Sequence, residues 1–121
     1  MVRIKTKTTM TQEERELFIA LCGYLPYETK IQCNTDFDIF DDILTTDYIH
    51  GMFFTAEDID CIPYLRPMDS MTTEEKAYYF AINESPVVCV DWLNKNKFDY
   101  RGFNWKGLAL EALKDMYKYN N

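Results

Sequence analysis

The chain has 121 residues, of which 47% are hydrophobic and 27% are charged, and its formal net charge is −7. This length fits one ordinary domain with a buried core, and the apolar fraction excludes a disordered acidic tail. The acidic balance argues against a dedicated nucleic-acid binder, because such a protein needs a basic surface to displace counterions from phosphates. We therefore expect a single domain over 1–121, with frayed ends at 1–10 and 118–121.

The first predicted element is an amphipathic helix over about 12–24. Thr11 and Glu14 have the spacing of a capping box, in which each side chain reaches the other residue's backbone amide. Gly23 and Pro26 supply the signals that end a helix. The apolar residues expected on one helical face are Leu17, Phe18, Leu21, Cys22 and Leu25.

The pattern over 29–68 changes and predicts a sheet. Gly51 marks a bulge in one predicted strand, and Pro63 would place another at an edge of the sheet. Turns are predicted at 34–36 and 45–47. The alternating, β-branched or aromatic runs are 31–33, 37–39, 48–54 and 59–65. Together they predict three or four short antiparallel strands.

The chain after the predicted sheet returns to helical signals. Thr72 and Glu75 have the spacing of a second capping box before an apolar run. Ser85-Pro86 is typical of an N-cap followed by the first residue of a helix. The apolar run inside 86–91 also fits a buried strand. Helix is favoured because 91–97 continues the pattern without a turn and ends in basic residues.

Two shorter patterns complete the chain. The segment 98–102 predicts a structured turn, and 107–113 predicts a short helix or a last strand. The order of elements predicts an α+β fold: an N-terminal helix, a three- to four-stranded antiparallel sheet, and then two to three C-terminal helices.

The cysteines and the start of the chain bear on the compartment. No pair among the four cysteines, at 22, 33, 61 and 89, has the C-x-x-C spacing of a zinc ribbon or a thioredoxin-like site. Polar, Thr-rich residues follow the basic start where a signal peptide would be apolar, and no apolar run is long enough to span a membrane. We expect a cytoplasmic protein with reduced thiols, although four cysteines leave a disulfide open.

The negative charge is concentrated in one segment, since 31–65 holds eight acidic and no basic residues. One interpretation is that these residues are solvated and keep the domain soluble. Another is a surface that meets a basic host protein such as a nucleic-acid enzyme, because carboxylates can occupy the Lys and Arg side chains that hold phosphates. The acidic residues, which are the candidate partner-binding residues, are Asp36, Asp38, Asp41, Asp42, Asp47, Glu57, Asp58 and Asp60.

The same residues do not fit a calcium loop. Asp36 and Asp38 match the first and third ligand positions of such a loop. Phe40 then falls on the fifth, Asp41 on the position that needs Gly, and Asp47 on the position of the bidentate Glu. We therefore expect no metal site.

No catalytic constellation is evident. His50 is the single histidine and would have to serve any Ser–His or Cys–His couple. Ser70 and Ser85 are explained by turn and cap positions, and the four glycines make no phosphate-binding spacing. We expect a protein that is not an enzyme and needs no cofactor.

Aromatic residues offer a further lead, since the chain has eight Phe, nine Tyr and two Trp. Tyrosine fills the boundary of many cores, but such an excess favours a protein that binds another protein. A different hypothesis uses Arg66, Tyr100 and Arg101 for stacking on, and anion contact with, a small ligand or nucleotide.

Two strings, Pro63-Tyr64-Leu65-Arg66-Pro67 and Phe98-Asp99-Tyr100-Arg101-Gly102, together with Gly107-Leu108-Ala109-Leu110-Glu111-Ala112, carry a family resemblance. From Leu17 onward the chain resembles a family of small uncharacterised proteins from phages and mobile elements of gut bacteria. It departs at Leu113-Lys114, where the family would have a Pro-containing turn. The family has no assigned activity, so the resemblance implies no catalytic residue. It implies a setting in which small accessory proteins bind host proteins, including defence nucleases.

These observations lead to a hypothesis and its alternatives. The first is a non-enzymatic, acidic protein-binding module of phage or mobile-element origin that inhibits a host nucleic-acid-binding defence enzyme in the manner of an anti-CRISPR protein. It would contact neither nucleic acid nor membrane directly. The alternative is a protein that binds or sequesters a small ligand or nucleotide, and a third is a self-associating domain. The sequence leaves the oligomeric state open.

Overall fold

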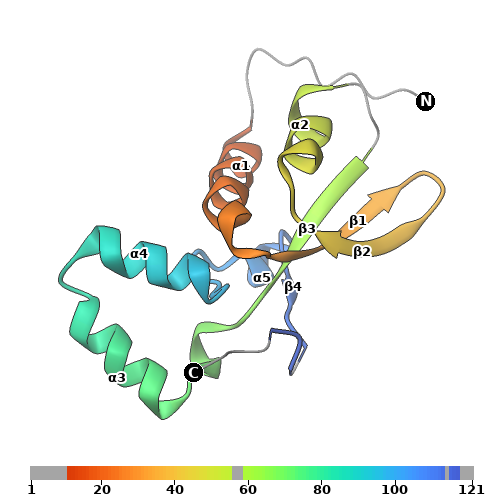
Figure 1. Cartoon of the computed structure of the whole chain (residues 1–121). Helices are drawn as coiled ribbons and strands as arrows, with labels where there is room; N and C mark the ends of the chain where they lie inside the picture. The colour runs from red at the N-terminus through yellow and green to blue at the C-terminus, as the bar shows by residue number, and fades with distance from the viewer. Residues whose placement is uncertain (1–10, 56–58, 114, 118–121) are drawn as a thin grey trace. The chain divides into compact units, whose positions relative to one another are not determined.

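Figure 1 shows the computed structural model of the chain, which describes residues 11–55, 59–113 and 115–117. The chain folds as two compact units, Met1–Pro63 (unit 1) and Tyr64–Asn121 (unit 2). The single domain expected over 1–121 stays a prediction, and the ends expected to fray, 1–10 and 118–121, lie outside the described residues.

Unit 1 begins with helix α1, Gln12–Tyr24, where the sequence predicts it. The hydroxyl of Thr11 accepts a hydrogen bond from the Glu14 amide, and the Glu14 carboxylate accepts one from the Thr11 amide, each at 3.1 Å. Both halves of the predicted capping box are therefore formed. The buried face consists of Leu17, Ala20, Leu21 and Tyr24. Cys22 was expected on that face and is instead exposed.

The turn after α1 is tight. The 3₁₀ helix η1, Leu25–Tyr27, extends the helix past Pro26. Glu28 then takes the left-handed conformation at φ 51°, which reverses the chain into the sheet. The hydroxyl of buried Thr29 donates to the Tyr24 carbonyl at 2.9 Å and fixes the strand start against the helix end.

The segment 48–54, expected to be a strand with a bulge at Gly51, is instead part of helix α2, Thr46–Phe54. The expected turn at 45–47 is the N-cap and first turn of this helix. The β-branched and aromatic composition of 48–54 favours a strand, but propensity of this kind is readily outweighed by tertiary packing.

The packing that holds α2 comes from α1. Ile49 and Phe53, four residues apart on one face of α2, are both buried. The ring of Phe18 on α1 meets those of Phe53 and Phe54 edge-on, with centroids 5.2 and 5.5 Å apart. Such edge-to-face contacts stabilise beyond the area they bury. Figure 1 shows α1 and α2 side by side.

Four strands make a mixed sheet with the hydrogen-bonding order β2-β1-β3-β4. The strands are β1 (Lys30–Thr35), β2 (Ile39–Ile43), β3 (Ile59–Leu65) and β4 (Leu110–Glu111). The pairs β1–β2 and β1–β3 are antiparallel, as predicted, whereas β3–β4 is parallel. The expectation of a purely antiparallel sheet is therefore wrong at β4.

The hairpin turn lies later than expected. Asn34 and Thr35, expected in a turn, still belong to β1, and Phe37, expected in a strand, lies in the turn. The Thr35 hydroxyl accepts hydrogen bonds from the amides of Phe37 and Asp38, at 3.2 and 3.0 Å. This local bonding is typical of a Ser/Thr turn and fixes the bend.

Backbone hydrogen bonds at the ends of the β1–β2 ladder show how β1 is oriented. The Leu44 amide donates to the Thr29 carbonyl at 2.8 Å. The Thr35 amide donates to the Asp38 carbonyl at 2.9 Å. Hydrogen-bonded and non-hydrogen-bonded positions alternate along an antiparallel pair. The odd-numbered residues of β1 therefore direct their N–H and C=O groups toward β2, and the even-numbered residues direct theirs toward β3.

This alternation explains how Pro63 fits into the sheet. Pro63 lies opposite Ile31, whose N–H and C=O groups face β2, so the missing N–H of the proline costs no bond with β1. The expectation that Pro63 places its strand at an edge is wrong, since β3 stands between β1 and β4 in the strand order.

Unit 2 contains three α-helices among its described residues, within the expected two to three. They are α3 (Thr73–Ile82), α4 (Pro86–Lys95) and the short α5 (Phe103–Lys106), which the sequence did not predict. The 3₁₀ helix η2, Met68–Ser70, precedes them. The open question over 86–91 is thus answered as helix, and 107–113 supplies the strand β4. In the described parts of both units, no helix combines the length and apolar character needed to cross a membrane.

One hydrophobic cluster of unit 2 forms around α4. Its buried residues are Met71, Cys89, Leu93 and Phe98, and Met68, Tyr79, Ile82, Trp92 and Tyr100 pack against them. Helices α3 and α4 lie side by side (Figure 1), and the rings of Tyr79 and Trp92 stack between them with centroids 6.3 Å apart.

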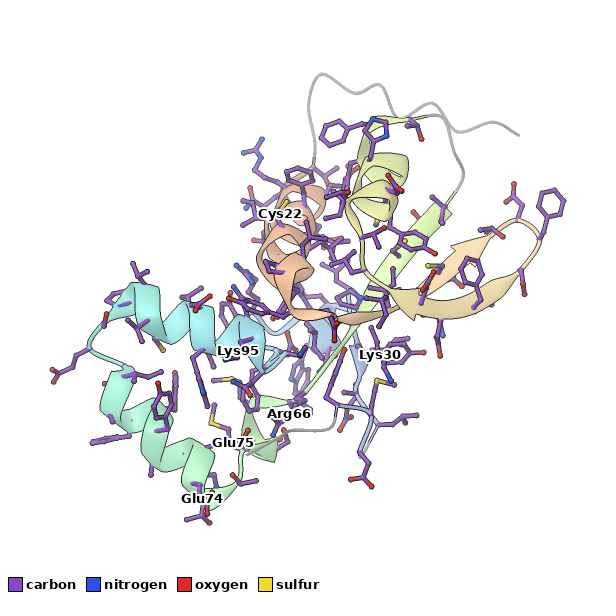
Figure 2. The ribbon with its side chains drawn as sticks, viewed as in Figure 1. Cys22, Lys30, Arg66, Glu74, Glu75 and Lys95 are labelled. Atoms are coloured by element: carbon purple, nitrogen blue, oxygen red, sulfur yellow. The ribbon has the colours of Figure 1, made fainter. Side chains whose placement is uncertain are left out.

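Arg66 and Glu75 join the end of β3 to the start of α3. The two terminal guanidinium nitrogens of Arg66, Nη1 and Nη2, donate to the two carboxylate oxygens of Glu75 at 2.9 and 2.8 Å. The side chains point toward one another in Figure 2 and are only 12% and 18% exposed. Glu75 also accepts from the Thr72 amide at 2.9 Å, which completes the second predicted capping box. The hydrogen bonds from Arg66 are the main reason that the pKa of Glu75 is lowered.

We expect the substitution Glu75→Gln to lower the free energy of unfolding by about 1.5–3 kcal/mol, because it breaks a bidentate, charge-assisted pair and leaves Arg66 without it. Glu74→Gln is the matched control, since Glu74 is exposed in the same helical turn, and its effect should stay within about 0.5 kcal/mol. Urea unfolding at neutral pH measures both. Equal losses would contradict the role assigned to Glu75.

The same pair should depend on pH. A lowered pKa means that the Glu75 carboxylate stabilises the fold above its ordinary pKa of 4.5, and that this contribution is lost as the pH falls through the lower pKa of the folded state. The difference in Tm between the wild type and Glu75→Gln should therefore shrink as the pH falls below 4.5. A constant difference would contradict the assignment.

Candidate functional site

Strand β2 is the outermost strand on its side of the sheet, and every one of its residues is exposed. It carries three apolar side chains, Ile39, Phe40 and Ile43, beside two acidic ones, Asp41 and Asp42. Ile39 is 63% exposed, and Phe37 in the adjoining turn is 98% exposed. An exposed outer strand that is also apolar is a ready template for pairing with another chain.

The outer edge of β2 is covered by its own carboxylates. The alternation along the β1–β2 pair directs the N–H and C=O groups of residues 39, 41 and 43 away from β1. The Ile39 amide donates to the carboxylate of Asp38 at 2.8 Å, and the Ile43 amide donates to that of Asp42 at 2.7 Å. An incoming strand must displace these carboxylates before it can pair with those amides.

Asp42 has a second donor in helix α2. The Tyr48 hydroxyl donates a hydrogen bond to its other carboxylate oxygen. This bond and the Ile43 amide lower the pKa of Asp42, and the neighbouring carboxylate raises the pKa of Tyr48. Asp42 is therefore held in its charged form while it remains exposed.

The structure brings together part of the predicted acidic set. Asp36, Asp38, Asp41 and Asp42 all lie on the β1–β2 hairpin, whereas Asp47 lies in the first turn of α2 and Asp60 on β3; all six are exposed. Glu57 and Asp58 lie outside the described residues.

These acids do not share one face of the sheet. Asp41 lies opposite Gln32 and Asp60 opposite Asn34, so Asp41 and Asp60 are on the same face as those polar residues. Asp42 lies opposite Ile31, which is fully buried, and so belongs to the other face. What the hairpin acids have in common is the outer edge of β2.

The exposed apolar residues of β2 were missed because the alternation around Ile39 suggested a buried face. The order Ile39-Phe40-Asp41-Asp42-Ile43 holds a signal against that interpretation. Adjacent apolar residues followed by adjacent acids put both kinds of side chain on each face, and neither face can then be wholly buried.

The candidate ligand residues lie in unit 2, where Arg66 is already engaged. Besides pairing with Glu75, its guanidinium carbon lies 4.1 Å from the centroid of the Phe98 ring. The Tyr100 hydroxyl donates to Asn94 at 2.9 Å, and burial raises the pKa of Tyr100.

Arg101 offers the stronger opening for a ligand. Its guanidinium carbon lies 4.5 Å from the centroid of the Tyr100 ring. Its Nη1 atom is buried with no hydrogen-bond partner in the structure. An orphaned buried donor of this kind can be satisfied by an anion or by water.

Among the described residues, the side chains considered for catalysis or metal binding do not form a site. His50 is exposed on α2, beside the ring of Phe54. Within the ranges that the structure describes, no three His, Cys, Asp or Glu side chains gather so that they could hold a metal ion.

Comparisons with protein-family models, with curated proteins and with solved structures found no match in any of the three.

We expect the double substitution D38A/D42A to promote self-association, because it uncovers two edge amides beside exposed apolar side chains. Light scattering over a concentration series measures this as a steeper rise in apparent mass than for the wild type. The control D36A/D47A removes the same charge without touching either amide. An equal rise in both variants would assign the effect to charge alone.

Proposed function

We propose that the protein is a non-enzymatic protein-binding module whose β1–β2 hairpin receives a basic segment of its partner. The observation that carries this proposal is β2 itself, an outer strand with exposed apolar side chains and carboxylates on its edge amides. Strand β2 lies within the segment 31–65, which contains no Lys or Arg.

The chemistry of the edge favours a partner that carries Lys or Arg. A cation that pairs with Asp38 or Asp42 draws the carboxylate away from the amide that it covers. The amide can then donate to a carbonyl of the incoming strand, and Ile39, Phe40 and Ile43 can pack against its apolar side chains. This is strand addition, in which main-chain bonds supply affinity and side chains supply specificity. An uncharged strand would bind with a less favourable free energy, because the carboxylates that it displaces are left without a partner.

Charge also argues against a second copy of β2 as the occupant. Antiparallel self-pairing centred on Asp41 sets Asp41 opposite Asp41, with Asp42 opposite Phe40 and the acids of both copies along one seam. Like charges directly opposite one another destabilise a pair of strands. The surface is therefore better matched to a basic protein than to itself.

The family resemblance supports a particular class of partner. Small accessory proteins of phages and mobile elements commonly act on host proteins, and a defence enzyme that binds nucleic acid presents a basic groove. Carboxylates that occupy that groove compete with phosphates for the same Lys and Arg side chains. The proposed activity is therefore inhibition of a host nucleic-acid-binding defence enzyme, in the manner of an anti-CRISPR protein.

The test is retention of a host protein from the lysate of a gut bacterium by the immobilised chain. The variant D38N/D41N/D42N removes three charges but keeps oxygen acceptors at the edge, and D36N/D47N/D60N removes three charges elsewhere. We expect the wild type and the second variant to retain a common basic protein, and the first to retain it at least about tenfold less. Retention should also fall as salt is raised above about 0.15 M.

Thermal unfolding of both variants provides the check on folding, and each should stay near the wild-type Tm because all six residues are exposed. Equal retention by the two variants, or no protein retained by the wild type, would refute the proposal. An acidic partner would also refute it.

Arg101 supports a second candidate function, binding of a small anionic ligand or nucleotide. The buried Nη1 atom and the adjacent Tyr100 ring provide an anion contact and a stacking surface. A nucleotide panel at millimolar concentration should then raise Tm by about 2 °C or more, since binding to the folded state alone stabilises it. Arg101→Gln should abolish the rise. A flat panel would exclude this candidate.

A further inference from the structure

Two of the four cysteines lie directly opposite one another in unit 1. Cys33 on β1 is in register with Cys61 on β3, and their sulfur atoms are 3.8 Å apart. Both residues are almost fully buried, at 0% and 1% exposure. By contrast, Cys22 is exposed on α1 (Figure 2), and Cys89 lies in the core of unit 2.

The backbone places this pair where a disulfide fits. Cys33 is an odd-numbered residue of β1, so its N–H and C=O groups face β2, and Cys33–Cys61 is a non-hydrogen-bonded pair of the β1–β3 ladder. At such positions the Cα atoms approach to about 4.5 Å, closer than at hydrogen-bonded positions. That separation is within the range of about 4.4–6.8 Å that disulfides span.

We propose that Cys33 and Cys61 form an oxidisable dithiol that closes into a disulfide between β1 and β3. The sulfur atoms must come about 1.8 Å closer to reach the S–S bond length of about 2.05 Å, which rotations of the two side chains can supply. No ladder hydrogen bond between β1 and β3 involves these two residues, so the closure breaks none.

Hydrogen peroxide is a sufficient oxidant. The sulfur of Cys33, which accepts the thiol hydrogen of Cys61, attacks one peroxide oxygen, and the O–O bond breaks to give a sulfenic acid and water. The sulfur of Cys61 then attacks the sulfenic sulfur, the S–O bond breaks, and the thiol proton leaves with the hydroxyl as a second water. Two thiols and one peroxide thus yield one disulfide and two waters, and the two electrons pass from sulfur to oxygen.

The reaction is slow compared with oxidation of an exposed thiol. Burial is the main reason that the pKa of Cys33 is raised, and the charges of Asp42 and Asp41 on β2 add to it. Hydrogen bonds with Cys61 on β3 and Tyr48 on α2 act in the opposite direction. Since the thiolate is the reactive form, the dithiol responds to sustained oxidation and not to trace peroxide.

The sequence makes the product simple to detect. No Lys or Arg lies between Lys30 and Arg66, and Pro67 blocks tryptic cleavage after Arg66. The tryptic peptide 31–76 therefore contains both Cys33 and Cys61 and no other cysteine. Its closure within one chain appears as the loss of two hydrogens together with loss of both alkylation sites.

The test uses the full chain with Cys22→Ser, treated with hydrogen peroxide under native conditions, alkylated after unfolding and digested with trypsin. We expect peptide 31–76 to be two hydrogens lighter and unalkylated, and dithiothreitol to restore both alkylations. The intact oxidised protein should unfold at a Tm roughly 5–15 °C higher, because the bond closes a long loop in the unfolded chain.

Three results would overturn the proposal. These are sulfinic or sulfonic acid on either cysteine without closure, a link from either cysteine to Cys89 or to a second chain, and two free thiols under conditions that fully oxidise Cys22 in the wild type. The control Cys22→Ser with Cys61→Ala should show neither closure nor a rise in Tm. If that control fails to fold, the peptide masses of the Cys22→Ser protein still decide the question.

Discussion

The register of β1 between its two antiparallel neighbours is the constraint on which the rest of unit 1 depends. Ile31 and Cys33 are buried, and a slip of one residue would exchange them for Gln32 and Asn34. The cost of burying an amide without partners therefore holds the strand in one position. The register of β1 also determines which amides of β2 face outward, and it places Pro63 of β3 where no hydrogen bond with β1 is lost.

The acidic residues of the hairpin cover the outer edge of β2, and the proposed recognition of a basic partner depends on the same arrangement. Asp38 and Asp42 cover edge amides, which protects an exposed apolar strand from pairing with any chain it meets. A Lys or Arg side chain can draw the carboxylate away from the amide, because a hydrogen bond between two charged groups is stronger than one from a neutral amide. The proposed recognition of a basic segment therefore uses the same residues that cover the edge of β2.

Local signals in the sequence predicted the elements they control, and non-local packing decided the others. The capping boxes at Thr11 and Thr72 formed as expected, because both partners lie within one helical turn. Helix α2 was taken for a strand because the ring of Phe18 that holds it belongs to another helix. A last strand within 107–113 was one of two alternatives, but its parallel pairing with β3 could not be foreseen, since a strand of two residues, Leu110–Glu111, leaves no periodic pattern. The eight acidic residues can be listed from the sequence. That Asp41 and Asp60 lie on one face of the sheet and Asp42 on the other follows only from the register of the strands.

Arg66 illustrates why residue types alone do not locate a site. An arginine near tyrosines in a specific string favours ligand contact, yet the structure gives this arginine to Glu75 and Phe98. Glu75 is also the third residue of α3 and closes the capping box. The same carboxylate therefore binds the residue that follows β3 and the N-cap of α3. A ligand at Arg66 would have to break both of these arrangements, whereas the Nη1 atom of Arg101 is buried and has no hydrogen bond to give up. The unpartnered Nη1 atom of Arg101 is therefore a better guide than the string around Arg66 to where unit 2 could bind an anion.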